Sequence, residues 1–226
     1  MFHRPRLDLF IYRMPACVAL VAGCASYNAR PIRARSAAEY AAHTQVTDLV
    51  AGAEALDTPE KSSAALGVDI SGEYVAVELV LDNAGADKWV VERSGAKLKC
   101  AAGTKTLDAV ASQAIFVDRK NDLGAAYAVG GWIGLSAASN ANEAMKADWS
   151  EKEFPAQFIL GPNQRKGGVL FFRGSCGNDP RTMTLAAERI ASGGALSLEI
   201  DLGIGPKREP KAGPSSGGWN QSKTPQ

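Results

Sequence analysis

The segment Glu73–Asp82 constrains the fold of this chain more than any other feature, because its side chains alternate strictly. One face of the extended segment carries Val75, Val77, Leu79 and Leu81, and the other carries Tyr74, Ala76, Glu78 and Val80. This period of two is typical of a half-buried β-strand. The sequence Asn83-Ala-Gly85 that follows has the residue types of a turn. We therefore expect one strand face in a core and the other toward solvent.

Further short segments with strand character recur along the chain, separated by Gly and Pro. They are Lys88–Cys100, interrupted near Ser94-Gly95, then Phe154–Leu160, Gly168–Arg173, Arg181–Ile190 and Ala195–Leu202. Short strands at this spacing are typical of an antiparallel β-sandwich. Gln45–Leu56 is a candidate for a first strand. Thr58-Pro59 predicts the start of a brief helix over 59–66, which Gly67 would end.

Two of these segments carry a family resemblance. Val77–Asn83, together with the later Leu160–Phe172, resembles immunoglobulin-like modules of bacterial envelope lipoproteins whose role is unknown. The resemblance covers roughly residues 45–202. It implies a mainly β chain, an antiparallel immunoglobulin-like β-sandwich over residues 45–204, with a Gly/Ala-rich helical segment inserted at about 123–149.

The inserted segment is unusual because it carries no charged residue from Leu123 to Asn142. Small residues recur in it at every fourth position: Ala126, Gly130, Gly134 and Ala138. On a helix they form one smooth stripe that lets another backbone approach closely. The stripe could pack within the fold, against a partner protein or against a membrane. Asn140 and Asn142 are polar and argue against insertion into a membrane.

The N-terminus has the order of a secretory leader. Basic residues lie between Met1 and Arg13, and the apolar stretch Met14–Ala22 follows. That stretch is too short to span a bilayer, which needs about 20 apolar residues. It ends in Val21-Ala22-Gly23-Cys24, which resembles the lipobox of bacterial lipoproteins. The resemblance implies cleavage before Cys24 and acyl chains on its thiol and amine.

The same resemblance indicates where the protein resides. Residue 25 is Ala rather than Asp, which favours the outer membrane, with the domain facing the periplasm. We thus divide the chain into a signal peptide (1–23), a lipid-anchored linker (24–44), the β-sandwich domain (45–204) and a disordered tail (205–226).

The cysteines agree with export. Cys17 leaves with the leader and Cys24 takes lipid, so Cys100 and Cys176 remain as a pair in an oxidising compartment. We predict a disulfide between them, with two buried free thiols as the alternative. After cleavage a single histidine, His43, remains, and no Cys-x-x-Cys pair is present. The usual zinc ligand sets therefore cannot be assembled, and we predict no metal and no cofactor.

Charge and motifs exclude several classes of function. Removing residues 1–23 takes away three arginines and one aspartate, so the net charge changes from +1 to −1. No long basic run is present, which excludes a typical nucleic-acid-binding protein. Gly213–Gly217 matches the G-x-S-x-G expression of hydrolases, but Gly and Pro surround it in place of a strand and a helix.

Two functional hypotheses follow. The first is a non-enzymatic binding or structural module of the cell envelope, held to the lipid bilayer by acylated Cys24 and docking an envelope protein. The alternative is an envelope hydrolase that uses surface carboxylates. Its candidate acids and bases are Asp118, Asp122, Glu151 and Glu153, which lie in polar, charged stretches.

Overall fold

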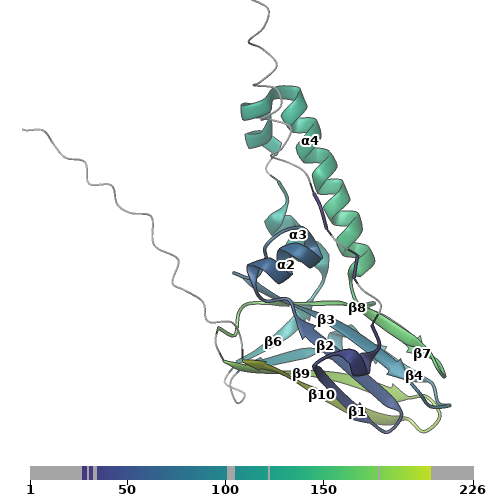
Figure 1. Ribbon diagram of the computed structural model, residues 1–226. Helices are drawn as coiled ribbons and strands as arrows, with labels where there is room; N and C mark the ends of the chain where they lie inside the picture. Colours follow the sequence, from purple (N-terminus) through teal and green to yellow (C-terminus); the bar gives the residue numbers. More distant parts are fainter. Residues whose placement is uncertain are drawn as a thin grey trace, which may run out of the picture.

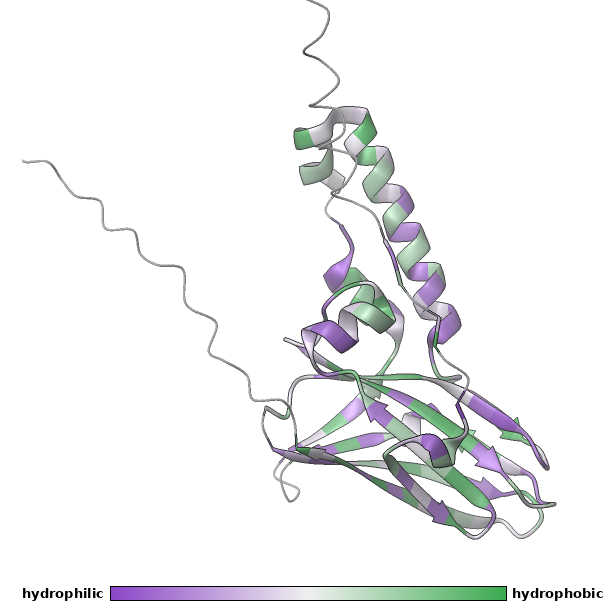
Figure 2. Ribbon diagram, in the orientation of Figure 1, coloured by the Kyte–Doolittle hydropathy of each residue, from purple (hydrophilic) through white to green (hydrophobic). Residues whose placement is uncertain are grey.

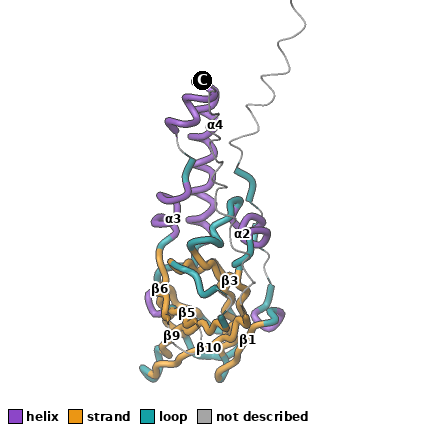
Figure 3. Tube along the Cα trace, turned by 90° about the vertical axis from the view of Figure 1, so that its left-hand side faces the viewer, coloured by secondary structure: helices purple, strands orange, loops and turns teal. Residues whose placement is uncertain are grey.

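The computed structural model describes residues 27–29, 31–32, 35–100, 105–121, 123–177 and 179–204. The strands are β1 (Ala42–Val46), β2 (Leu49–Ala55), β3 (Tyr74–Asn83), β4 (Trp89–Glu92), β5 (Lys97–Cys100), β6 (Lys105–Val110), β7 (Gln157–Leu160), β8 (Arg165–Arg173), β9 (Pro180–Arg189) and β10 (Gly194–Ile204). The helices are α2 (Pro59–Leu66), α3 (Ser112–Arg119) and α4 (Leu123–Lys152), with 3₁₀ turns η1 (Ala37–Glu39) and η2 (Arg93–Gly95). The helices gather at one side of the strands, and α4 projects farthest (Figures 1 and 3).

The named strands all pair antiparallel. β1, β2, β3 and β8 lie side by side, whereas β4, β5 and β10 pair with β9, and β7 pairs with β4. β6 belongs to both groups: its first residues pair with β5, and Ala109 and Val110 pair with β8. The prediction of a mainly β, antiparallel chain with an inserted helical segment is confirmed. The finer immunoglobulin-like sandwich topology stays a prediction.

Both strand groups contribute to the main hydrophobic core. Its residues include Val77 and Leu79 of β3 and Met183 and Leu185 of β9. Each of these side chains is almost completely removed from water. Burial of such aliphatic side chains contributes about 1.5–3 kcal/mol each, so this cluster is the main source of stability.

Strand β3 differs from its prediction, because both of its faces are buried. Val75, Val77, Leu79 and Leu81 face the main core, as the alternation predicts. The opposite face was expected in solvent, but Tyr74 and Ala76 lie in a second core beneath the helices. Val80, on the same face, packs with Ala37 and Tyr40 around η1. The expectation of a half-buried strand is wrong because elements distant in sequence cover its second face.

Local turn and capping chemistry predicts some elements well and misses others. Helix α2 begins and ends where expected: the Thr58 hydroxyl accepts a hydrogen bond from the Lys61 amide at 3.2 Å, and Gly67 ends the helix with φ 72°. The single strand expected over Gln45–Leu56 is instead divided between β1 and β2 by a turn at Thr47-Asp48. β6 and α3 were not predicted.

Candidate functional site

Helix α4 consists of two helical segments joined at Gly131. This residue has φ 58° and ψ −144°, a conformation open mainly to glycine. The bend turns the first segment back onto the second: a Cβ atom added to Gly134 would lie 2.4 Å from the carbonyl oxygen of Ala126. Backbone thus meets backbone, and only a residue without a side chain fits at position 134.

The bend determines where the predicted small-residue stripe lies. Ala126 and Gly134 come together across it, Gly130 adjoins it, and Ala138 is buried farther along the helix. The four residues therefore do not form one straight line. Ala126 and Gly134 lie against each other across the bend, and both are half-buried.

The large apolar side chains near the bend point outward. We call residues 124–135 the hairpin tip. Val129, Trp132 and Ile133 in it are 84%, 77% and 67% exposed. In Figure 2 the far end of α4 is coloured green and white, and purple residues begin nearer the strands. Surface helices of soluble proteins normally turn large apolar residues inward and polar residues outward. At the hairpin tip, by contrast, large apolar residues face outward.

The opposite end of α4 is anchored in the protein. Met145 and Trp149 are buried in the second core, where the Trp149 ring lies 6.0 Å from that of Phe171. The Trp149 indole N–H donates to the carbonyl oxygen of Leu66 at 2.9 Å. We call residues 141–152 the base of α4.

A pair of asparagines links α4 to the residues that precede it. The Asn142 side chain accepts a hydrogen bond from the Asn121 backbone N–H at 2.7 Å and donates one to the Asn121 carbonyl at 3.1 Å. Asn142 is thus buried with its hydrogen bonds satisfied. It is not one of the groups that the hairpin tip presents outward.

The chain that follows the predicted lipidation site is docked on the base of α4. The Tyr27 hydroxyl donates to the Asp148 carboxylate at 2.6 Å. Its ring lies so close to Gly67 that a Cβ atom there would approach it to 2.6 Å. Burial, and then the hydrogen bond to Asp148, raise the pKa of Tyr27 well above its usual value. Cys24 itself lies outside the described residues, as does the predicted disordered tail.

A second set of contacts fixes the same segment to the sheet. Glu54 and Glu78 lie directly opposite each other on β2 and β3, and Arg35 reaches them at 2.7 and 3.6 Å. The Tyr40 hydroxyl donates to Glu78, and the Arg35 guanidinium lies 4.0 Å from the centre of the Tyr40 ring. Arg35 lowers the pKa of the Glu54 carboxyl. A neighbouring cavity of about 310 Å³ is lined by these charged groups and by Lys61, which pairs with Glu54 at 3.0 Å.

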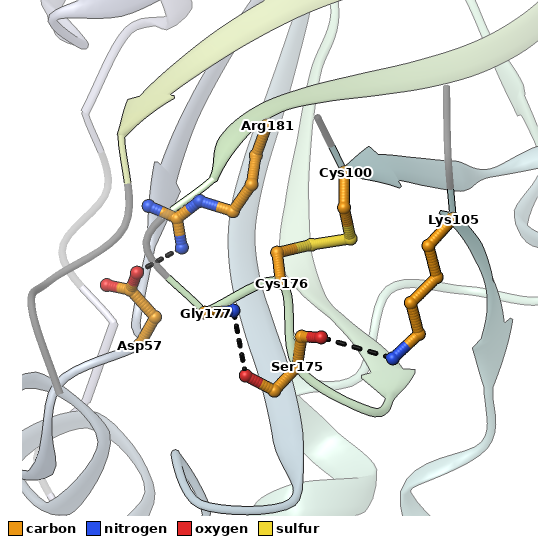
Figure 4. Close-up of a disulfide and its surroundings, with 7 residues drawn as sticks. All are labelled: Asp57, Cys100, Lys105, Ser175, Cys176, Gly177 and Arg181. Atoms are coloured by element: carbon orange, nitrogen blue, oxygen red, sulfur yellow. Dashed lines mark hydrogen bonds and ion pairs between the residues drawn. A yellow bond between two sulfur atoms is a disulfide. The ribbon is translucent and has the colours of Figure 1, made fainter. Parts of the chain in front are cut away.

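Cys100 and Cys176 form a disulfide, which confirms the predicted pair. The bridge ties the end of β5 to the loop after β8, with a Cα–Cα distance of 5.3 Å (Figure 4). Nearby, Arg181 of β9 forms a buried ion pair with Asp57. The bridge and the ion pair fasten the loops at this end of the strands.

The carboxylates proposed for hydrolysis lie apart, as far as the structure describes them. Glu153 pairs with Arg93 and accepts a hydrogen bond from the Ser112 hydroxyl at 2.7 Å. Asp118 accepts from the Tyr74 hydroxyl and lies 3.4 Å from Arg173. Glu151 is exposed, and Asp122 lies outside the described residues. Each described member thus has its own surroundings, and the structure does not gather them in one cleft.

Two searches of the described residues bear on metals and membranes. Neither a cluster of three or more potential metal-ligating His, Cys, Asp or Glu side chains nor a helix long and apolar enough to cross a bilayer is found in that part of the chain.

Comparison with known proteins gives little for this chain. No family model matches it, and no curated protein matches it. Among solved structures, the yjhA protein from Bacillus subtilis aligns with 10% identity and a TM-score of 0.34, covering 65% of this chain and 78% of that protein. A DUF4426 family protein from Pseudomonas aeruginosa PAO1 aligns with 13% identity and a TM-score of 0.33, covering 74% and 95%. Alignments at this level support no assignment of function.

Proposed function

We propose that the protein is a bacterial lipoprotein, anchored through acylated Cys24, whose immunoglobulin-like domain serves as a non-enzymatic binding or structural module of the envelope, at the outer membrane facing the periplasm. The observation that carries this proposal is the docking of Tyr27, three residues after Cys24, onto the base of α4. A chain held so soon after its anchor keeps a fixed geometry relative to the lipid.

Two further observations support the proposal. The Cys100–Cys176 disulfide is typical of proteins that fold in an oxidising compartment. The carboxylates Asp118 and Glu153 are paired with Arg173 and Arg93, a structural use that leaves them poorly suited to acid–base catalysis. The hydrolase alternative has no observation in its favour.

Intact mass of the protein extracted from native membranes tests the anchor. We expect loss of residues 1–23, added acyl mass on Cys24, and two hydrogens fewer than the reduced chain. The Cys24→Ser variant is the control, and we expect it to stay unacylated. A wild-type chain that is neither cleaved nor acylated would overturn the proposal.

The non-enzymatic role is tested separately in cells that lack the protein. We expect a chain carrying D118N, D122N, E151Q and E153Q to complement any phenotype of that strain as wild type does, provided that it folds. Circular dichroism of the purified variant checks folding. Loss of complementation by a folded variant would favour the hydrolase.

A further inference from the structure

We propose that the hairpin tip of α4 inserts into the surface of the same lipid bilayer that holds acylated Cys24, so that the protein is attached at two points. This inference rests on the proposed lipid anchor.

The first step concerns reach. Tyr27 is fixed to Asp148, and it is the third residue after Cys24. Three residues span at most about 11 Å. The acyl chains on Cys24 therefore bring the bilayer surface close to the base of α4, and no long linker holds the folded domain away from it.

The second step concerns which surface can face the lipid. The strands lie at the end of α4 opposite the hairpin tip (Figure 1) and carry exposed charged residues such as Lys97, Asp108 and Glu199. Placing charged side chains in hydrocarbon is strongly unfavourable. The uncharged hairpin tip is therefore the surface that we place against a bilayer this close to Tyr27, with the strands away from the membrane.

The third step concerns length. From Asp148 to Trp132, α4 extends about 24 Å, roughly twice the ~11 Å that the chain from Cys24 to Tyr27 can span. From Trp132 to Glu143, the first charged residue of α4 after the bend, the distance is about 16 Å. The hairpin tip can therefore enter the surface of the bilayer without carrying a charged residue of α4 into it.

The fourth step concerns chemistry. Three large side chains of the hairpin tip, Val129, Trp132 and Ile133, are mostly exposed. Tryptophan is enriched where membrane meets water, and aliphatic side chains gain free energy in the lipid below. The small residues at 126 and 134 keep the two helical segments in contact, so the hairpin is a thin wedge. Its contact is interfacial rather than membrane-spanning.

The test uses the full acylated protein, reconstituted in vesicles of phosphatidylethanolamine with a minority of phosphatidylglycerol. Trp219 is replaced by Phe, which leaves Trp132 as the exposed tryptophan beside buried Trp89 and Trp149. Lipids with brominated acyl chains quench only tryptophans that lie among them. We expect loss of Trp132 emission with these lipids, and no such loss once Trp132 is also replaced by Phe.

Two double variants localise the effect. V129S/I133S keeps Trp132 as reporter and should reduce the quenching. I159S/I190S removes two exposed isoleucines from β7 and the β9–β10 turn and should leave it unchanged. Equal quenching with and without Trp132, on a chain whose mass confirms acylated Cys24, would overturn the second attachment while the anchor stands.

The remaining outcomes are also decisive. Trp132 shielded from aqueous iodide but not quenched by brominated lipid would mean that protein, either a second copy or another partner, covers the hairpin tip. That result overturns the lipid assignment. A chain without acyl mass on Cys24 removes the proposed anchor, and this inference with it.

Discussion

Each end of helix α4 carries a tryptophan, and the two tryptophans lie in opposite surroundings. At the base, Trp149 is 1% exposed and packs under charged neighbours such as Asp148 and Lys152. At the hairpin tip, Trp132 is 77% exposed, and small residues occupy the inner side. The base is built for burial within the protein. At the tip, Val129, Trp132 and Ile133 stay mostly exposed.

The base of α4 therefore stabilises the fold, whereas the hairpin tip exposes apolar side chains that contribute little to stability. Contacts at the base are satisfied within the chain: Trp149 donates to Leu66, and Tyr27 donates to Asp148. The apolar side chains of the hairpin tip gain little from folding, because they stay mostly in water.

The largest effect should come from removing the buried tryptophan. We expect Trp149→Ala to lower the free energy of unfolding by about 3–5 kcal/mol, because it loses a fully buried ring and leaves a cavity. Trp132→Ala in the same helix is the matched control and should change it by less than about 0.5 kcal/mol. Urea unfolding of the two purified variants measures both values. A comparable loss of unfolding free energy in both variants would contradict the view that only the base of α4 stabilises the fold.

The next effect concerns the bend at the tip. Gly134→Val places side-chain atoms against the Ala126 carbonyl, which lies 2.4 Å from the position of a Cβ atom. We expect the hairpin to open at a local cost of about 1–3 kcal/mol. Hydrogen exchange of amides 124–130 should accelerate while the midpoint of urea unfolding changes little, because local opening leaves the core intact. Exposed Ser136→Ala is the control and should leave exchange unchanged.

The hairpin itself could be predicted from the sequence only in part. A helix at 123–149 follows from composition, and α4 spans Leu123–Lys152. The four-residue spacing of small residues assumes a straight helix, whereas Gly131 breaks it. Two adjacent glycines, Gly130 and Gly131, were the available indication of that bend. Which side of a bent helix faces water depends on tertiary packing, and this packing cannot be predicted from the local sequence pattern.

The strands show the same limit. β3, β8, β9 and β10 lie where alternation and Gly/Pro turns predict them. β6 was missed because it divides its pairing between two strand groups, which blurs any period of two. The turn at Thr47-Asp48 lacks glycine, proline and asparagine, and Thr47 itself takes the positive φ of 53°. The buried second face of β3 requires contacts with α2, α3 and α4 that alternation cannot reveal.

The segment from Tyr27 to Tyr40, which we call the anchor segment, contacts both the base of α4 and the sheet. A smaller effect tests how firmly it holds the base. We expect Tyr27→Phe to lose the bond to Asp148 and about 0.5–1.5 kcal/mol of stability at neutral pH. The raised pKa of Tyr27 means that this stabilisation is present below the unfolded value of about 10 and is lost as pH rises through the folded value. The gap between wild type and variant should therefore close in alkaline urea titrations. A gap that persists at high pH would show that the hydroxyl is not the titrating group.

The smallest effect belongs to the Arg35–Glu54 contact, which fixes the other end of the anchor segment to β2. Arg35 lowers the pKa of Glu54, so this stabilisation is present above the unfolded value of about 4.3 and is lost as pH falls through the folded value. A third of each side chain is exposed, and solvent screening limits the contact to below about 1 kcal/mol. Glu54→Gln should thus be slightly less stable than wild type at neutral pH, with the difference vanishing in acid.

That acid titration also sharpens the contrast between the two ends of α4. Glu54 lies on β2 and not on the helix, so E54Q should leave the Tyr27 contact and the exchange of the hairpin-tip amides unchanged. E54Q loosens the anchor segment at Arg35. If this accelerated hydrogen exchange of the hairpin-tip amides, a structural change at the sheet would be transmitted through the base of α4 to the tip. The hairpin tip would then depend on the anchor segment for its own structure as well as for its position near the lipid.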